Sequence, residues 1–440
     1  MEWIVWPGPG MRGEGADPGW AAGVVLAVAE AMREGGDAPE ILEKSGEIRA
    51  RGYLTPSEDE VLWACYAVFL ARRAALLQVL ASMESRAGHR GGSWAREPGA
   101  FVVALTAASL LIRGMREWIR LADACRPVRK ALDQGDARAG VPRKAFAESY
   151  RATTSWWRLR RYEQACRHFR EHREAFGPHP GQPKEWAALL DRLDRELDSG
   201  ACRASLRERW RYRWFSFRRR HHSAWKRSEF GVFRWSGSLI AELRQPGMKP
   251  PGASKRVDAG LRGKALAATM PGDVFITRHD DALSNLFLPG FWPHAALFVR
   301  GVDGDFLEAR KDGVKWRAAE DTLAVDAFVI LRPPLGKGEI DAALARAASH
   351  AGKPYDFSFD FRRSDRLACT EVVYRAFHGI GGLDFALVET GGRLCLPAEE
   401  LIRQALEQGF EVVGSAGIGK GGWLTGRVAE LALHATRCGL

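Results

Sequence analysis

The sequence predicts an α+β protein, with an all-α N-terminal region followed by a smaller domain that combines an antiparallel sheet with helices. Up to residue 270, apolar residues recur at the spacing of amphipathic helices, and no alternating strand pattern interrupts them. Beyond it, short runs of β-branched and aromatic residues are separated by turn signals. A chain of 440 residues, 46% hydrophobic and 27% charged, is globular and long enough for two or three domains.

The N-terminal region, residues 1–244, is predicted to be helical and basic. A helix start is visible at Thr55-Pro56-Ser57-Glu58, where Thr or Ser caps the helix and Pro occupies its first turn. Clusters of glycine, proline and aspartate divide the region into separate helices. The helices are expected at about 20–34, 56–84, 98–133, 143–176, 185–199 and 201–243.

The net charge of +11 is unevenly distributed along the chain. Residues 1–250 hold 42 Lys and Arg against 30 Asp and Glu, whereas residues 251–440 hold 23 against 24. The basic character therefore belongs to the first half alone.

The positive charge is densest in residues 203–227, which carry ten Lys or Arg against one acid, with tryptophans at helical spacing. One interpretation is a bundle helix whose aromatic side chains are core and whose arginines extend into solvent. The alternative is a basic surface, including Arg218, Arg219 and Arg220, that binds an anionic membrane or another acidic partner. Nucleic acid is the least favoured partner.

The seven cysteines are scattered singly, with no CxxC pair. This spacing excludes a zinc ribbon and argues against a secreted disulfide framework. The N-terminus lacks the charged start and long apolar core of a signal peptide. The longest apolar tract, near residues 101–112, is about half of what a bilayer span needs. We therefore expect a reduced, cytoplasmic protein, with a peripheral position at a membrane as the alternative.

Residues 245–270 are rich in Pro, Gly and Lys and are interpreted as a linker. The domain that follows, residues 271–415, is predicted to combine antiparallel strands with helices. A Gly-rich tail with a short helix is expected over residues 416–440. The expected strands are 272–277, 294–300, 305–310, 313–319, 327–334 and 410–413, and the expected helices are 338–351, one that begins at Cys369, and 397–408.

Cys369 opens an amphipathic helix, because apolar residues recur at helical spacing behind it. A thiol at a helix N-terminus feels the positive end of the helix dipole and unpaired backbone N–H groups, which lower its pKa and favour the nucleophilic thiolate. Its own backbone N–H is a candidate donor to an oxyanion. The alternative is an inert buried cysteine, which we expect for the other six.

A cysteine nucleophile needs an imidazole that takes and returns a proton. His294 stands at the start of PHAALFV, an apolar run rich in β formers, where a core strand would hold the ring in place. A histidine in such a run can equally be a satisfied core residue. His279 and His350 are rival bases, whereas His378 lies nine residues along the same helix as the cysteine, more than two turns away.

Five short motifs, GDVFIT, PHAALFV, LEA, GKPYDF and CTEVVYRAF, occur in this order over about residues 272–412. In order and spacing they resemble the permuted papain-fold hydrolases of the YiiX/YaeF type, relatives of the NlpC-type cysteine peptidases and of the lecithin:retinol acyltransferase group. The histidine precedes the cysteine, as circular permutation of a papain-like chain would give. The resemblance implies a permuted papain-like fold and a cysteine hydrolase, and it says nothing about residues 1–250.

Carried over to this sequence, the resemblance implies Cys369 as nucleophile and His294 as general base and acid. It implies Glu308 as the third polar residue, which orients the imidazole. It also implies that Tyr355 places a hydroxyl near the oxyanion or the substrate.

The role of Glu308 depends on the register of its strand. A two-residue turn at Asp303-Gly304 would place it on the face opposite His294, because side chains alternate along a strand. A three- or five-residue loop, with the glycine in the left-handed conformation, would restore the correct face. Substitutes for the carboxylate are Asp303, Asp305, Asp280 and Asp281.

The segment before His294, DALSNLFLPGFWP, places large apolar residues in a loop that contains Pro and Gly. Some of them are expected to pack in the core. Phe287, Phe291 and Trp292 are candidates for an apolar entrance that admits an acyl chain or a hydrophobic side chain.

We therefore predict a cysteine hydrolase of the amidase or peptidase type, which attacks an amide or ester carbonyl through a thioacyl-enzyme and needs no metal or organic cofactor. The substrate is expected to be a small peptide, an N-acyl compound or a lipid. One alternative is a thiol-dependent lipid hydrolase or acyltransferase at an anionic membrane surface. Another is a non-catalytic adaptor whose helical half binds an acidic partner.

Overall fold

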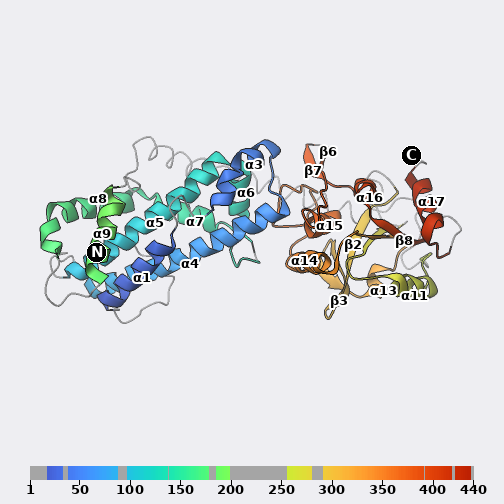
Figure 1. Ribbon diagram of the computed structural model, residues 1–440, viewed down its shortest axis with the longest axis horizontal. Helices are drawn as coiled ribbons and strands as arrows, with labels where there is room; N and C mark the ends of the chain where they lie inside the picture. Colours follow the sequence, from blue (N-terminus) through green and yellow to red (C-terminus); the bar gives the residue numbers. More distant parts are fainter. Residues whose placement is uncertain are drawn as a thin grey trace. The chain divides into compact units, whose positions relative to one another are not determined.

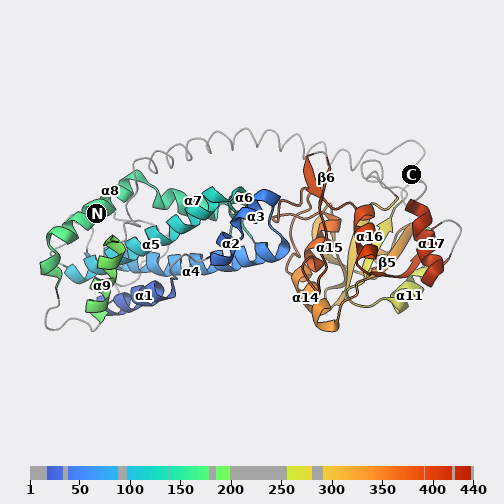
Figure 2. The same cartoon turned by 45° about the horizontal axis from the view of Figure 1, so that its top comes forward.

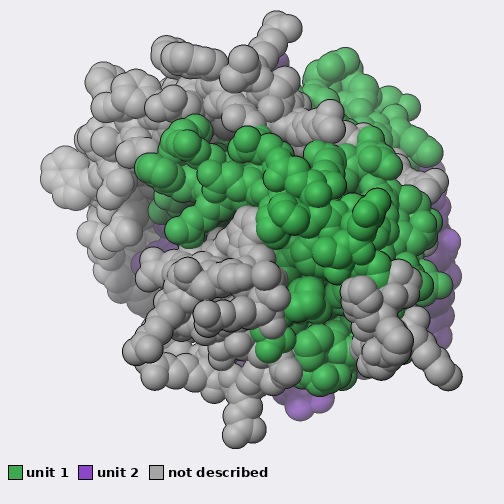
Figure 3. All heavy atoms as spheres, turned by 90° about the vertical axis from the view of Figure 1, so that its left-hand side faces the viewer, with its two compact units in different colours: residues 1–52, 58–225 green, residues 53–57, 226–440 purple. Residues whose placement is uncertain are grey.

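The computed structural model of the chain divides into two compact units (Figures 1 and 3). The helical unit comprises Met1–Gly52 and Glu58–Trp225, and the sheet unit comprises Tyr53–Ser57 and Lys226–Leu440. The residues that the structure describes are 17–32, 38–87, 97–136, 138–177, 185–198, 255–279, 291–390, 392–418 and 422–437.

The helical unit has the all-α character that the sequence predicts. Among its described residues, the β-type pairing is confined to an isolated bridge between Asp136 and Val141. Its elements are α1 (Pro18–Ala31), α2 (Pro39–Glu43), α3 (Ser45–Arg51), α4 (Pro56–Ala87), α5 (Pro98–Ala124), α6 (Arg126–Gln134), α7 (Ala145–Thr153), α8 (Trp156–Glu171), η1 (Arg173–Phe176) and α9 (Glu185–Asp198).

Helix α5 supplies much of the core of the helical unit, where it packs with α1, α8 and α9. By length and composition alone, α5 and the stretch Pro56–Met83 of α4 could cross a membrane, although the core helix of a soluble protein passes the same test. Within the apolar window of α5, 78% of the residues are buried, against 33% for α4. Burial in the core of the unit accounts for the hydropathy of α5.

Two of the expected helices are each divided in two. The helix expected over 98–133 is interrupted at Cys125, where Pro127 in the first turn of α6 favours a new helix start. The helix expected over 143–176 is interrupted near Thr154, between α7 and α8. Helices α2 and α3 lie where no helix was expected, and the helix expected over 201–243 lies outside the described residues.

The sheet unit is organised around a six-stranded antiparallel sheet with the order β4-β3-β2-β1-β5-β8. Figure 2 labels strand β5 of this sheet together with helices of the same unit. The strands are β1 (Val274–Arg278), β2 (His294–Gly301), β3 (Gly304–Arg310), β4 (Gly313–Arg317), β5 (Ala327–Arg332) and β8 (Glu411–Ala416), with a separate hairpin of β6 (Val388–Thr390) and β7 (Arg393–Cys395). The helices are α11 (Ala259–Ala268), α13 (Ala319–Thr322), α14 (Lys337–Ala348), α15 (Cys369–Phe377), α16 (Ala398–Glu407) and α17 (Gly426–Arg437).

Both faces of this sheet are covered. One face packs against α14, α15, α16 and α17, and the other packs against α11 and α13. Successive residues of β2 alternate between the two cores: Ala295 and Leu297 belong to the first, Ala296 and Phe298 to the second. Because both faces are buried, the strands read as nearly continuous apolar runs.

The structure corrects two of the expected boundaries. The segment 245–270, interpreted as a linker, contains α11, whose Ala265 is buried against the sheet. The segment 416–440, interpreted as a tail, contains α17, whose Ala429 and Leu433 are buried in the core behind the sheet. Their glycines and short apolar runs carry no long-range signal, so only tertiary packing shows that both segments belong to the domain.

Candidate active site

Cys369 is the first residue of α15 and is 3% exposed. The helix is anchored in the core through Val372, Val373 and Phe377. Glu371 stabilises the helix start, because its carboxylate accepts a hydrogen bond from the backbone N–H of Ala368 at 3.2 Å. The sulfur therefore lies at the positive end of a rigidly held helix dipole.

The groups around the sulfur favour its thiolate form. Burial raises the pKa of the Cys369 thiol, but the charge and hydrogen bond of His294 and the backbone N–H groups of Ala295 and Thr370 outweigh it, so that the pKa lies below its ordinary value. The carbonyl oxygen of Pro293 lies 3.9 Å from the sulfur. The structure thus brings together the two residues that the sequence singled out as nucleophile and base.

His294 is the first residue of β2, and its Nε2 lies 2.7 Å from Oε2 of Glu308. This contact leaves Nδ1 as the ring nitrogen for the hydrogen bond with Cys369. Burial lowers the pKa of His294, but the charge and hydrogen bond of the Cys369 thiolate, together with those of Glu308, raise it to about 9. Both shifts favour a thiolate beside an imidazolium over a neutral pair.

Glu308, in β3, is fully buried but well compensated. Its Oε1 accepts a hydrogen bond from the hydroxyl of Thr322 at 3.1 Å and forms ion pairs with Nε of Arg310 at 2.7 Å and Nε of Arg317 at 3.1 Å. Burial raises the pKa of Glu308, but the hydrogen bond and charge of His294 and the charges of the two arginines lower it overall. The carboxylate is ionised and can orient the imidazolium.

A β-bulge puts Glu308 on the same face as His294. The turn between β2 and β3 is Val302-Asp303, between the paired residues Gly301 and Gly304, and the register shifts by one residue between Phe298 and Gly301. Arg300 lies in this irregular segment and has a left-handed φ of 52°. The turn is therefore neither the two-residue turn at Asp303-Gly304 nor the three- or five-residue loop, the two possibilities that the sequence left open.

The consequence of the bulge can be read from the pairing. Phe298 pairs with Phe306, and extending that register places Ala296 opposite Glu308. Residues opposite each other share a face, as do His294 and Ala296, two positions apart. Without the extra residue, the carboxylate would point to the opposite core.

Tyr355 lies beside the nucleophile. Its backbone forms a bridge with Leu367, two residues before Cys369, and its side chain is hydrogen-bonded to the sulfur. Burial, followed by the charge of Cys369, raises the pKa of Tyr355 well above its ordinary value. The tyrosine therefore stays protonated and can donate a hydrogen bond.

Residues 268–416, a third of the chain, match the family model of permuted papain-like amidase enzymes of the YaeF/YiiX type, the C92 family. No curated protein and no solved structure matches the chain. The match confirms the resemblance seen in the sequence. It also supports amidase-type cysteine hydrolase activity for the papain-like domain, as we call residues 268–416.

Two of the three residues proposed for an apolar entrance, Phe291 and Trp292, lie within the described residues. Trp292 is 1% exposed and packs in the core, so its assignment to an apolar entrance was wrong. The ring of Phe291 is half-buried and has the guanidinium of Arg278 4.4 Å from its centre, which makes its surroundings cationic. Phe287 lies outside the described residues.

Two of the rival residues have partners elsewhere, and two others lie outside the described residues. Nδ1 of His378 accepts a hydrogen bond from the backbone N–H of Phe385 at 3.2 Å. Asp305 accepts a hydrogen bond from the backbone N–H of Ala319 at 3.2 Å. Of the candidate bases, His294 is the one shown hydrogen-bonded to Cys369. Asp280 and Asp281, like Arg218, Arg219 and Arg220, are not among the described residues.

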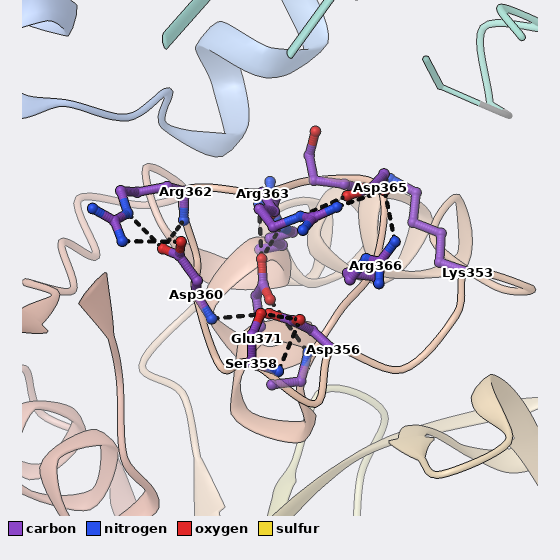
Figure 4. Close-up of polar contacts among 12 residues, drawn as sticks. Lys353, Asp356, Ser358, Asp360, Arg362, Arg363, Asp365, Arg366 and Glu371 are labelled. Atoms are coloured by element: carbon purple, nitrogen blue, oxygen red, sulfur yellow. Dashed lines mark hydrogen bonds and ion pairs between the residues drawn. The ribbon is translucent and has the colours of Figure 1, made fainter. Parts of the chain in front are cut away.

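A polar network holds the loop between Tyr355 and Cys369 (Figure 4). The carboxylate of Asp356 accepts hydrogen bonds from the hydroxyl of Ser358 at 2.5 Å and from the backbone N–H of Asp360 at 2.9 Å. Arg375 pairs with Glu371 at 2.8 Å and donates a hydrogen bond to the carbonyl of Arg363 at 2.7 Å.

Burial raises the pKa of Glu371 to about 8 although Arg375 opposes the shift. The sequence indicated that Glu371 stabilises the helix end, and its bond to Ala368 agrees with that role. The buried ion pair with Arg375 was not foreseen, because it depends on the loop that folds over this helix. Among the described residues, no group of three or more His, Cys, Asp or Glu could hold a metal ion.

Proposed function

We propose that the papain-like domain is a cysteine amidase that cleaves the amide bond of a peptide or N-acyl substrate through a thioacyl-enzyme. The observation that carries the proposal is the chain of hydrogen bonds from Cys369 through His294 to Glu308. An amide substrate suits this hydrogen-bonded triad better than an ester does. An imidazolium with a pKa of about 9 is the resting form, and a leaving amine needs that proton.

In acylation, the Cys369 thiolate attacks the carbonyl carbon and forms a C–S bond, and the carbonyl oxygen becomes an oxyanion. The intermediate then collapses: the C–N bond breaks, and His294 transfers its proton to the leaving nitrogen. In deacylation, neutral His294 takes a proton from water as that water attacks the thioester. The acid and the thiolate–imidazolium pair result.

The oxyanion has two candidate donors. The backbone N–H of Cys369 points from the start of α15, where helix N–H groups lack intrahelical partners. The hydroxyl of Tyr355, held beside the sulfur, is the second. Each such donor contributes on the order of 3 kcal/mol of transition-state stabilisation.

The test is to incubate the full chain with matched amide and ester substrates and to follow both turnover and the intact mass of the protein. We expect the amide series to be hydrolysed and a covalent acyl adduct to accumulate on Cys369 in the wild type and not in C369A. Turnover that persists in C369A contradicts the proposal. Absence of both turnover and thiol alkylation in the wild type would favour the adaptor alternative.

A reducing compartment such as the cytoplasm fits this chemistry. The five cysteines within the described residues are not joined in disulfides. A thiolate nucleophile loses activity on oxidation, so such an enzyme needs a reducing environment.

We propose, as a second candidate, that the chain acts on lipid amides or esters at an anionic membrane surface. Helix α8 favours it, because Trp156 and Trp157 are 45% and 68% exposed and Arg160 lies 5.2 Å from the ring centre of Trp156. The helix carries five arginines and two glutamates. Exposed tryptophans with flanking arginines match the interfacial region of a bilayer.

The two candidates differ in where the substrate is presented. Turnover of a lipid-linked amide that rises with the fraction of anionic lipid in the vesicles favours the second. Equal turnover of soluble and vesicle-bound amides, whatever the vesicle charge, favours the first alone.

A further inference from the structure

The C-terminal helix α17 lies beyond the residues that match the amidase family, yet it is built into the same core. The family match ends at residue 416, whereas α17 runs from Gly426 to Arg437. Ala429 and Leu433 are buried in the cluster that also holds α15 and Trp292. The helix is therefore placed to act on the active site.

The first link from α17 to the site is the side chain of Trp292. Its Nε1 donates a hydrogen bond to Oγ1 of Thr436 at 3.0 Å, across 144 positions of sequence. The hydroxyl of Thr436 in turn donates to the carbonyl of Leu433 at 2.6 Å. With its proton directed into the helix, the threonine oxygen is fixed as the acceptor for the indole.

The second link runs through Glu399 of α16. Its Oε1 accepts hydrogen bonds from the backbone N–H groups of Phe291 at 2.7 Å and of Trp292 at 3.0 Å. Its Oε2 lies 3.5 Å from Nε of Arg437, in α17. One carboxylate thus connects the C-terminal helix to the backbone just before β2.

This backbone needs external anchors. The pairing of β2 with β1 begins at His294, so residues 291–293 form no strand hydrogen bonds with β1. Their polar groups are instead held by side chains: Glu399 binds two N–H groups, and Arg278 donates to the carbonyl of Phe291 at 2.7 Å. Removing these partners would leave buried backbone donors unsatisfied.

The anchored segment leads directly to the reacting atoms. Pro293 has its backbone φ restricted by its ring, so the orientation of Trp292 is passed on to the next residue with little freedom. The carbonyl of Pro293 lies 3.9 Å from the sulfur of Cys369, and the next residue is His294. A displacement of about 1 Å at such a site can cost up to about 100-fold in rate.

We propose that α17 is a positioning element, in which Thr436 and Arg437 hold Phe291 and Trp292 so that His294 stays aligned with Cys369. This role rests on the proposed function only in assuming that Cys369 and His294 form a reactive pair. It adds that the pair needs residues of α17, which lie outside the residues that match the family. Neither residue touches substrate, and both act through the segment before β2.

The experiment compares T436V, T436S and E399Q in the full chain, with alkylation of Cys369 by iodoacetamide at pH 6.5 as a readout that needs no substrate. We expect T436V to lower the alkylation rate and kcat about 10-fold, with KM unchanged, because the indole loses its acceptor. T436S keeps the hydroxyl and should restore both rates to within about twofold of the wild type. E399Q retains an acceptor for the two backbone N–H groups but loses the charge that pairs with Arg437. Its alkylation rate and kcat should lie between those of T436V and T436S.

V428T, on an exposed position of the same helix, is the matched control and should behave as the wild type. Melting temperatures separate positioning from unfolding: T436V should remain folded at the assay temperature. A T436V protein that is folded and alkylated at the wild-type rate overturns the inference, as does a T436S protein no faster than T436V. If wild-type Cys369 itself reacts no faster than an ordinary thiol, the proposed function fails instead.

Discussion

Each unit contains a cluster of buried carboxylates paired with arginines. Only the cluster in the sheet unit also contacts a histidine that is hydrogen-bonded to a thiol. In the helical unit, Nη2 of Arg138 binds Asp59 at 2.8 Å and Asp136 at 2.7 Å, and Asp59 also accepts from the indole N–H of Trp63 at 3.1 Å. In the sheet unit, the arginines around Glu308 leave one carboxylate oxygen for His294, which leads on to a thiol.

The two clusters separate burial of charge that joins elements of the fold from burial that serves the proposed reaction. A buried ion pair costs desolvation energy and is weak evidence for stability by itself. The cluster around Arg138 consists of contacts that tie α4 to the loop before α7. The cluster around Glu308 contacts His294, which is hydrogen-bonded to the proposed nucleophile Cys369. Variants of the two clusters should therefore separate stability from reactivity.

The largest expected effect is that of C369A, which removes the thiol that is hydrogen-bonded to His294. We expect kcat to fall by about 10⁴-fold or more, because the variant lacks the sulfur that would form the acyl-enzyme. C125A is the control. Burial raises the pKa of the Cys125 thiol, so its removal should leave turnover unchanged.

Peptide mapping after alkylation at pH 6.5 should find the label on Cys369, and labelling spread evenly over all cysteines would contradict this assignment.

Next in size is the contrast between E308Q and D136N. We expect E308Q to lower kcat by about 10²- to 10³-fold, because the imidazolium loses its orienting charge. D136N should lower the free energy of unfolding by about 3 kcal/mol, because Arg138 loses a buried partner. It should leave the alkylation rate of Cys369 unchanged. Equal effects of both variants on alkylation would remove the distinction between the clusters.

The pH dependence tests the reactive cluster in the wild-type chain. His294 has a pKa raised to about 9, so kcat/KM for an amide should fall as pH rises through about 9, when the imidazolium is lost. The raised pKa also contributes stability that is fully present below the ordinary histidine pKa and is lost as pH rises through about 9. The excess in unfolding free energy of the wild type over H294Q should therefore shrink between pH 6.5 and pH 9. A constant difference across this range would contradict the pairing.

The smallest expected effect concerns the surface of α8. We expect the double variant W156S/W157S to weaken sedimentation with anionic vesicles several-fold, while alkylation of Cys369 stays as in the wild type. W20S, at an exposed tryptophan of α1, is the control and should bind as the wild type does. Replacing Arg218, Arg219 and Arg220 by Ser should also weaken binding. Each cation near such a bilayer contributes on the order of 1 kcal/mol, an effect that salt screens. Equal sedimentation with neutral and anionic vesicles would exclude the membrane role.

Local sequence patterns were enough to predict the class of the fold and the candidate cysteine–histidine pair. Apolar spacing separated the helical half from the strands, and the position of Cys369 at the start of an amphipathic helix indicated the candidate nucleophile. These features are local: periodicity, capping and turn residues act over a few positions and are legible without knowing the partners. The position of His294 at the start of an apolar strand belongs to the same kind of signal.

Only the tertiary structure decided which groups complete the site. The sheet face to which Glu308 points depends on a bulge at Arg300. No residue pattern predicts the left-handed backbone of this arginine. The burial of Trp292 depends on Thr436, 144 positions away. Such contacts form between segments whose local patterns are independent of one another, so they appear only when the sheet and its covering helices are assembled.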